Sequence, residues 1–130
     1  NFRILPGDTV DSVLEHVRTT IDDPAIKVSV LGRGDNPSPV SDVNTPAFAY
    51  LARSIRATNP DAVVSPFLVL GATDARYYSD LTPNVYRFVP MRTRPEDVTR
   101  FHGLNERIAV ENYAGMIAFY VELLGNLKAI

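Results

Sequence analysis

The sequence contains no cysteine, and only two of its 130 residues are histidines. Without cysteine, neither a disulfide framework nor a thiolate metal site is possible, so any metal ion must be bound by histidine and carboxylate side chains. Long apolar runs are also missing. The longest one, residues 62–70, contains Ser65 and Pro66 and is too short to cross a bilayer. We therefore predict no membrane-spanning segment in this chain.

The chain has no excess of charge of one sign. Thirteen basic and fifteen acidic residues give a net charge of −2, and the two signs are interspersed. This pattern predicts binding neither to nucleic acid nor to a membrane surface. With 45% hydrophobic residues the chain can form a core, and its length suits one domain or part of a larger one. The start at Asn1, directly in a strand-like pattern, favours a piece of a longer protein and indicates no compartment.

The first 30 residues have the pattern of a strand, a helix and a second strand. Residues 1–5 alternate in polarity before Pro6-Gly7, and residues 26–30 alternate again. Between them, Asp8 or Thr9 is expected to cap a helix. The apolar face of this helix comprises Val10, Val13, Leu14, Val17 and Ile21. His16 lies off that face and is interpreted as a solvated helix residue.

A linker is predicted at residues 31–44, which are rich in glycine, proline and serine. Thr45-Pro46 then starts a helix, and residues 62–70 are apolar at nearly every position, as in a strand buried on both faces. The later elements are expected to be a turn at 71–78, a strand at 84–89, a helical turn from 95 and a helix at 111–127. The predicted core faces of the two longer helices are Phe48, Leu51, Ala52 and Ile55, and Tyr113, Met116, Ile117, Tyr120 and Leu124. The pattern favours an α/β fold.

Two turns carry the polar residues that could form a site. Thr73, Asp74 and Arg76 follow the apolar segment directly, and α/β proteins place ligand groups beyond the carboxyl ends of their strands. An ion pair between Asp74 and Arg76 that stabilises the turn is an equally good interpretation. The second turn contains His102. Because carboxyl ends of strands share an edge of a sheet, the two turns are expected to meet there.

His102 lies in the octet Arg-Phe-His-Gly-Leu-Asn-Glu-Arg at 100–107. A neutral imidazole there can bind a metal ion, and Glu106 or a backbone carbonyl can fix its tautomer. Gly103 permits a tight turn or a close approach of the backbone to a ligand. On the octet alone, a surface loop with a locally hydrogen-bonded histidine is the stronger interpretation, and Arg33-Gly34-Asp35, which matches a short adhesion motif, carries no inference.

The chain as a whole resembles the zinc-dependent aminoacylase/carboxypeptidase family of metallopeptidases, most of all its carboxypeptidase S branch. The resemblance covers essentially all 130 residues in order. It is carried by Asn-Phe-Arg-Ile-Leu-Pro-Gly-Asp-Thr at 1–9, Gly-Ala-Thr-Asp-Ala-Arg-Tyr-Tyr at 71–78, Val-Tyr-Arg-Phe-Val-Pro at 85–90 and His-Gly-Leu-Asn-Glu-Arg-Ile at 102–108. It implies the second half of a ferredoxin-like lid or dimerisation domain at 1–34, a linker at 35–44, and the C-terminal part of an α/β zinc-peptidase catalytic domain at 45–130.

The resemblance also implies roles for single residues. His102 corresponds to the last metal ligand, on the second of two zinc ions. Arg3 corresponds to a lid arginine that binds the free carboxylate of the substrate, while Thr73 and Arg76 line the pocket that holds it. The residues Asp74, Asn105 and Glu106 are expected to support these groups.

The implied function belongs to a longer protein. The other metal ligands and the catalytic glutamate of the family have no counterpart here, so this chain is expected to be inactive alone, with at most one zinc ligand. For the longer protein, we expect hydrolysis of the amide bond of N-acyl amino acids or small peptides, and a homodimer. A dimerisation or binding module without catalysis is the alternative. A family member that has lost its metal is a weaker third possibility.

Overall fold

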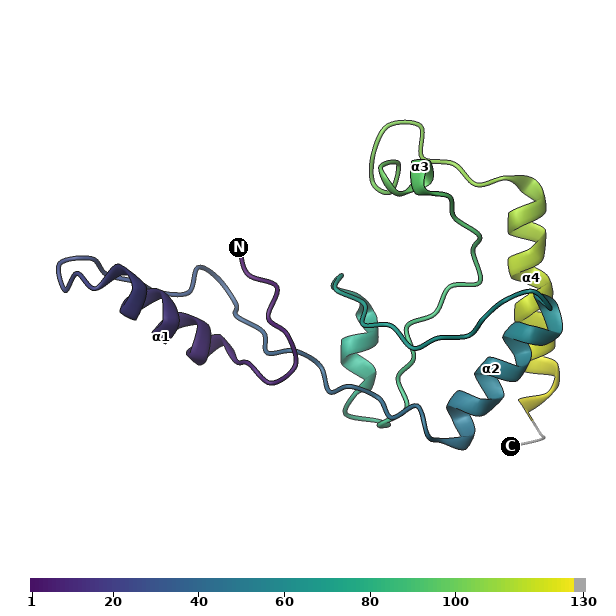
Figure 1. Ribbon diagram of the computed structural model, residues 1–130, viewed down its shortest axis with the longest axis horizontal. Helices are drawn as coiled ribbons and strands as arrows, with labels where there is room; N and C mark the ends of the chain where they lie inside the picture. The colour runs from purple at the N-terminus through teal and green to yellow at the C-terminus, as the bar shows by residue number, and fades with distance from the viewer. Residues whose placement is uncertain (128–130) are drawn as a thin grey trace. The chain divides into compact units, whose positions relative to one another are not determined.

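The computed structural model describes residues 1–127 and shows a helical chain (Figure 1). Its elements are α1 (Val10–Ile21), α2 (Pro46–Thr58), the 3₁₀ helix η1 (Asp74–Tyr78), α3 (Pro95–Val98) and α4 (Val110–Gly125). They fall into two compact units. The first unit comprises Asn1–Ser41 and Leu70–Val85, and the second comprises Asp42–Val69 and Tyr86–Ile130. Among residues 1–127, no helix has both the length and the apolar character needed to cross a membrane.

Local signals fix the start of α1, as predicted. The Thr9 hydroxyl accepts the backbone N–H of Ser12 at 3.0 Å, and the Ser12 hydroxyl accepts that of Thr9 at 2.9 Å, which forms a reciprocal capping box. Of the two predicted caps, Thr9 is therefore the one used. The helix ends where Asp22 takes a left-handed conformation with φ of 46°. No residue of α1 is buried, although Val13, Leu14 and Val17 are half-buried.

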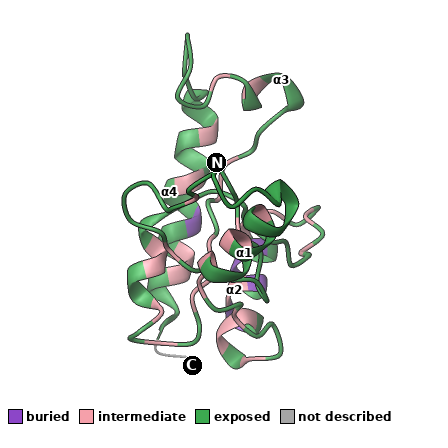
Figure 2. Ribbon diagram, turned by 90° about the vertical axis from the view of Figure 1, so that its left-hand side faces the viewer, coloured by how far each residue is buried: buried purple, intermediate pink, exposed green. Residues whose placement is uncertain are grey.

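Helices α2 and α4 pack together and form the core of the second unit. The Thr45 hydroxyl caps α2 by accepting the backbone N–H of Phe48, and Pro46 lies in the first turn of the helix, as the sequence predicted. The buried residues, purple in Figure 2, belong to these two helices. They are Tyr50, Ala52, Ser54 and Ile55 of α2 and Phe119 of α4. The ring of Phe119 lies 5.2 Å from that of Phe88, and the Tyr50 hydroxyl donates to the carbonyl of Leu123.

The predicted core face of α4 is wrong. Tyr113, Ile117 and Leu124 are 56%, 52% and 62% exposed, whereas Phe119, which lies off the predicted face, is only 1% exposed. The helix carries apolar residues on every side, so the sequence alone offers more than one stripe of period 3.6. Contacts with α2 and Phe88 decide which stripe is covered, and these contacts are not local in sequence.

The predicted strands do not form. Residues 1–127 contain no β-strand, and the segments 1–5, 26–30, 62–70 and 84–89 are irregular. The segment expected to be buried on both faces is exposed, with Val63 and Phe67 at 91% and 87%. A strand needs a neighbouring strand for its backbone N–H and C=O groups, and an apolar pattern does not show where that neighbour is. The structure of this chain therefore does not confirm the α/β assignment or the lid made of strand, helix and strand.

The contact between Tyr50 and Leu123 gives a first testable prediction. Tyr50→Phe should weaken the α2–α4 packing by about 1 kcal/mol, because the Leu123 carbonyl loses its hydroxyl donor. Backbone amides of both helices should then exchange hydrogen about fivefold faster than in the wild type. Tyr113→Phe is the matched control, since Tyr113 is an exposed tyrosine on α4, the helix that contains Leu123. Unchanged exchange in Tyr50→Phe would show that this hydrogen bond does not hold the helices together.

Candidate functional site

Arg76 is held by a carboxylate from another part of the first unit. Its Nη2 atom lies 2.8 Å from Oδ1 of Asp35, which also receives Nε of Arg33 at 3.0 Å. The side chains of Arg76 and Asp35 are 32% and 31% exposed. One interpretation of Arg76 was an ion pair with Asp74 that stabilises the turn. That interpretation is wrong, because the carboxylate that pairs with Arg76 is that of Asp35. Asp35 was not predicted as a site residue, since 41 positions separate it from Arg76 and no pattern joins them.

The other site residues predicted in the first unit lie at the surface. Asp74 is the first residue of η1, and Thr73 precedes it. The backbone N–H of Arg76 donates to the Thr73 carbonyl at 3.3 Å, which closes the first turn of η1. Arg3 is exposed, and within residues 1–127 its side chain makes no hydrogen bond or ion pair. The structure thus places Asp74 and Arg76 on one short helix with Thr73 directly before it, and the Arg3 side chain is exposed.

A shallow hollow follows η1 in the same unit. Its volume is about 270 Å³. The hollow is lined by Pro39, Ser41, Ser79, Asp80, Leu81, Thr82, Pro83 and Val85. The Ser41 hydroxyl donates to the Val85 carbonyl at 3.1 Å and accepts the Val85 N–H at 2.9 Å, so one serine joins the two segments that form the walls. Sequence reasoning missed this serine, because its partner lies 44 residues away.

His102 belongs to the second unit and lies in an exposed loop. It adopts a left-handed conformation with φ of 57°, as does Asn105 with φ of 58°. Its backbone N–H donates to Oε1 of Glu106 at 3.2 Å. The glutamate therefore supports the loop through the backbone of His102, whereas the sequence had suggested a contact with the imidazole. Among the side chains of residues 1–127, no group of three or more histidine, aspartate or glutamate residues is placed to hold a metal ion. A catalytic zinc ion needs about three protein ligands, and His102 is the one candidate that the sequence offers.

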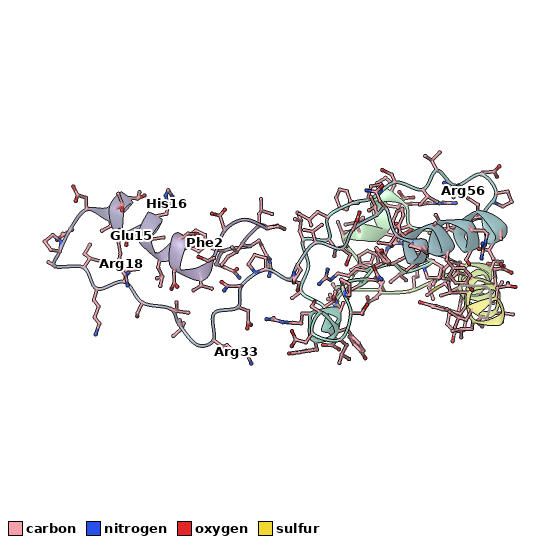
Figure 3. The ribbon with its side chains drawn as sticks, turned by 90° about the horizontal axis from the view of Figure 1, so that it is seen from below. Phe2, Glu15, His16, Arg18, Arg33 and Arg56 are labelled. Carbon is pink, nitrogen blue, oxygen red and sulfur yellow. The ribbon has the colours of Figure 1, made fainter. Side chains whose placement is uncertain are left out.

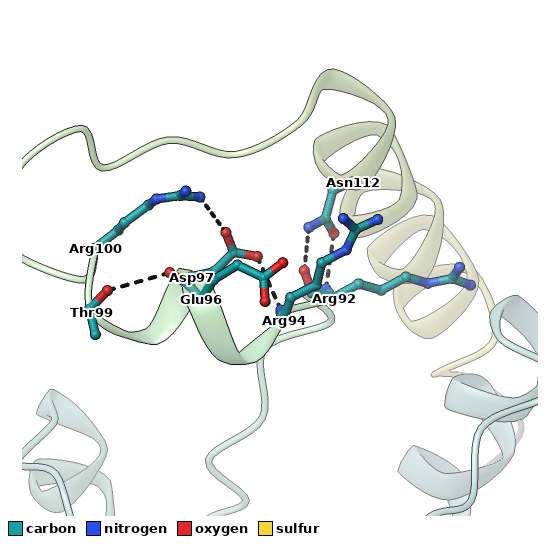
Figure 4. A network of polar contacts seen from close by, with 7 residues as sticks. All are labelled: Arg92, Arg94, Glu96, Asp97, Thr99, Arg100 and Asn112. Atoms are coloured by element: carbon teal, nitrogen blue, oxygen red, sulfur yellow. Dashed lines mark hydrogen bonds and ion pairs between the residues drawn. The ribbon is translucent and has the colours of Figure 1, made fainter.

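A polar network, shown in Figure 4, holds the segment before His102. Asp97 accepts the backbone N–H of Arg94 at 3.0 Å and the guanidinium of Arg100 at 2.6 Å, which braces α3 at both ends. Asn112 of α4 accepts the backbone N–H of Arg92 at 3.0 Å and donates to its carbonyl at 2.7 Å. A single amide thus replaces the two bonds that a neighbouring strand would supply and ties this segment to α4.

Gly103 makes a tight turn, one of the two roles that the sequence suggested for it, and its backbone N–H donates to the Arg100 carbonyl at 2.9 Å. A Cβ atom on Gly103 would lie 2.8 Å from the carbonyl oxygen of Thr99. Gly103→Ala is therefore expected to destabilise the protein by at least about 1 kcal/mol in urea unfolding. Gly115→Ala is the control, because its added Cβ meets nothing within 4 Å inside α4 and should stabilise the helix by about 0.5–1 kcal/mol. Equal stability of Gly103→Ala and wild type would contradict the tight packing of this loop.

Comparison with known proteins assigns the chain to a protein family. Residues 5–126 match the model of peptidase family M20/M25/M40, and the chain belongs to this family of peptidases. The resemblance read from the motifs is thereby confirmed, including its carboxypeptidase S-like branch.

Curated relatives match nearly the whole chain. It is 37% identical over 128 residues to probable carboxypeptidase S-like 2 of Dictyostelium discoideum, covering 98% of this chain and 25% of that protein. It is 38% identical over 129 residues to N-fatty-acyl-amino acid synthase/hydrolase PM20D1 of Homo sapiens, covering 97% and 26%. The PM20D1 protein of Xenopus tropicalis is 41% identical over 128 residues, covering 97% and 25%. The chain thus spans about a quarter of the length of these relatives. No solved structure matches it.

Proposed function

We propose that the full-length protein containing this chain hydrolyses the amide bond of N-acyl amino acids or small peptides that end in a free carboxylate. The observation that carries the proposal is the match of residues 5–126 to a peptidase family, together with relatives named probable carboxypeptidase S-like 2 and N-fatty-acyl-amino acid synthase/hydrolase. Both names describe substrates with the same feature, an amide bond followed by a free carboxylate. We therefore define the substrate by that feature and do not specify its acyl group.

In this proposal, the first unit contributes the carboxylate-binding groups. Arg3 and Arg76 bind the carboxylate, because a planar guanidinium presents parallel N–H donors that fit its two oxygens. Thr73, at the start of η1, lines the same pocket, with Asp74 beside it. Arg76 is partly exposed and Arg3 is exposed, which supports the proposal, since both side chains can be reached from solvent.

The metal centre belongs to the full-length protein. We place His102 as one ligand of a pair of zinc ions, with Asn105 and Glu106 shaping its loop. The remaining ligands come from other parts of the polypeptide. The exposed imidazole and the left-handed backbone at His102 support this placement, because an outward-facing ligand on a braced loop can meet residues from another segment.

The fold proposed for the full-length protein is the α/β fold of the resemblance. Residues 1–34 form the second half of a lid domain, residues 35–44 the linker, and residues 45–130 the end of the catalytic domain. Apolar side chains without cover support this arrangement, for example Leu31 at 100% and Val63 at 91% exposure. Such residues stabilise a protein when further chain covers them. Segments that are irregular in residues 1–127 would then pair with strands supplied elsewhere.

The proposal is tested by product analysis. The purified full-length protein should release free amino acid from an N-fatty-acyl amino acid, and mass spectrometry measures the amount released. A metal chelator should abolish the release and added zinc should restore it. Absence of release from N-acyl amino acids and from dipeptides, with zinc present, would contradict the proposed function.

A dimerisation module is the second candidate, favoured by the open apolar surface of the first 31 residues. Phe2, Ile26, Val30 and Leu31 are 59%, 53%, 41% and 100% exposed. We expect a dimer joined through this segment, and Val28→Lys should dissociate it at micromolar concentration in analytical ultracentrifugation. Arg94→Ala is the control outside the segment. A well-folded monomer in the wild type would contradict the proposed contact.

A further inference from the structure

We infer that Asp35 is a positioning residue, which orients the Arg76 guanidinium so that it can bind the carboxylate of the substrate. The inference rests on the proposed function, in which Arg76 binds that carboxylate, and it adds a residue with no assigned role. Its basis is the placement of Asp35 between two arginines on a loop that is itself fixed.

The loop that carries Asp35 has little freedom. On one side of it, the Asn36 side chain accepts the backbone N–H of Val10 at 2.9 Å, at the start of α1. On the other side, a Cβ atom on Gly34 would lie 3.0 Å from Val10 and 3.3 Å from Val30. Gly34 thus lets the loop lie directly on these two valines, where any side chain would be crowded. The two anchors fix the backbone of Asp35 from both neighbours.

The contact with Arg76 leaves most of the guanidinium unused. Oδ1 of Asp35 forms an ion pair with Nη2 of Arg76 at 2.8 Å, and the centroid of the Tyr77 ring lies 5.7 Å from the guanidinium carbon. Within residues 1–127, no other anion or acceptor contacts this guanidinium. Since an arginine carries five N–H donors, enough remain for a bidentate contact with a second carboxylate. Two arginines, Arg33 and Arg76, against one Asp35 also leave a net charge of +1 in the cluster.

Positioning and neutralisation predict opposite results for loss of the Asp35 charge. If Asp35 orients Arg76, its loss weakens binding of the carboxylate, because the freed guanidinium samples many rotamers. If Asp35 only neutralised the cluster, its loss would raise the net charge and strengthen binding of an anion. The structure favours orientation, since Gly34 and Asn36 fix the backbone of Asp35. Arg33, whose side chain is 83% exposed, lies on the outer side of the loop (Figure 3).

The test compares Asp35→Asn with wild type in the full-length protein, using an N-acyl amino acid and its N-acyl amino amide. KM for the acid should rise about tenfold with little change in kcat, and the constants for the amide should stay the same. Asp35→Glu should restore part of the binding. Asp61 is an exposed aspartate in the second unit, so Asp61→Asn should leave KM and kcat unchanged for both substrates. In the Arg76→Ala background, Asp35→Asn should have no further effect.

Each outcome separates the inference from the proposed function. A lower or unchanged KM for the acid in Asp35→Asn, while Arg76→Ala selectively impairs the acid, would overturn the role of Asp35 alone. Equal loss on acid and amide in Asp35→Asn would also overturn it, because a general structural defect does not depend on the substrate carboxylate. If Arg76→Ala itself affects both substrates equally, the carboxylate-binding role fails and Asp35 has no group to position.

Discussion

His102→Ala in the full-length protein is expected to lower the zinc content from about two ions per chain to about one and to reduce kcat/KM about a hundredfold or more. The reason is that a zinc ion is held by few protein ligands, so the loss of one imidazole opens the site. The loop of His102 is braced through Asp97, Asn112 and the contact of Glu106 with the His102 backbone. Alanine preserves these contacts, so the change should remove the ligand and keep the loop.

The other histidine provides the control for this substitution. His16 is exposed on α1, off its apolar face, and its side chain points away from the helix in Figure 3. His16→Ala should leave both the zinc content and kcat/KM unchanged. Metal analysis of His102→Ala that finds both zinc ions, together with normal turnover, would refute the ligand assignment. Equal losses in both variants would show that neither effect reports on a metal ligand.

Arg76→Ala is expected to lower kcat/KM at least about tenfold for substrates with a free carboxylate and far less for the matching amides. Losing a charge-assisted hydrogen-bonded pair costs about 1.5–3 kcal/mol, and the amide substrate never forms that pair. Arg3→Ala should have the same selectivity, since Arg3 is assigned to the same carboxylate. The matched control is Arg56→Ala, an exposed arginine near the end of α2 (Figure 3).

The substrate comparison distinguishes binding from structure. Arg76 already pairs with Asp35, so its removal also breaks an ion pair within the protein. A structural loss of that kind would reduce turnover of acid and amide alike. Equal losses in Arg3→Ala and Arg76→Ala would therefore show that these arginines stabilise the fold and do not recognise the substrate.

Local signals in the sequence predicted the helices well. Thr9 and Thr45 cap α1 and α2 as expected, because an N-cap depends only on a hydroxyl and the N–H groups two or three residues away. Pairing between distant segments was not predictable in the same way. The strands expected at 26–30 and 62–70 depend on neighbours that periodicity cannot identify. The face of α4 depends on Phe88 and α2, and the sequence offered several apolar stripes.

The candidate site shows the same division. The sequence singled out Arg76 and Gly103, and the structure gives both a defined environment. The sequence did not reveal Asp35, because an ion pair between residues 41 positions apart leaves no pattern in a single sequence. The roles of His102 and Arg3 stay predictions, since both side chains are exposed in residues 1–127 and their proposed partners are a metal ion and a substrate.

We propose that this chain recognises the free carboxylate of the substrate of an amidohydrolase. The most direct test of this proposal is the ratio of kcat/KM for an N-acyl amino acid to kcat/KM for the corresponding N-acyl amino amide, measured on the wild-type full-length protein. We expect a ratio of at least about ten in favour of the acid, because only a carboxylate can accept the charge-assisted hydrogen bonds of the arginines. A ratio near one, with both substrates hydrolysed, would contradict the proposal.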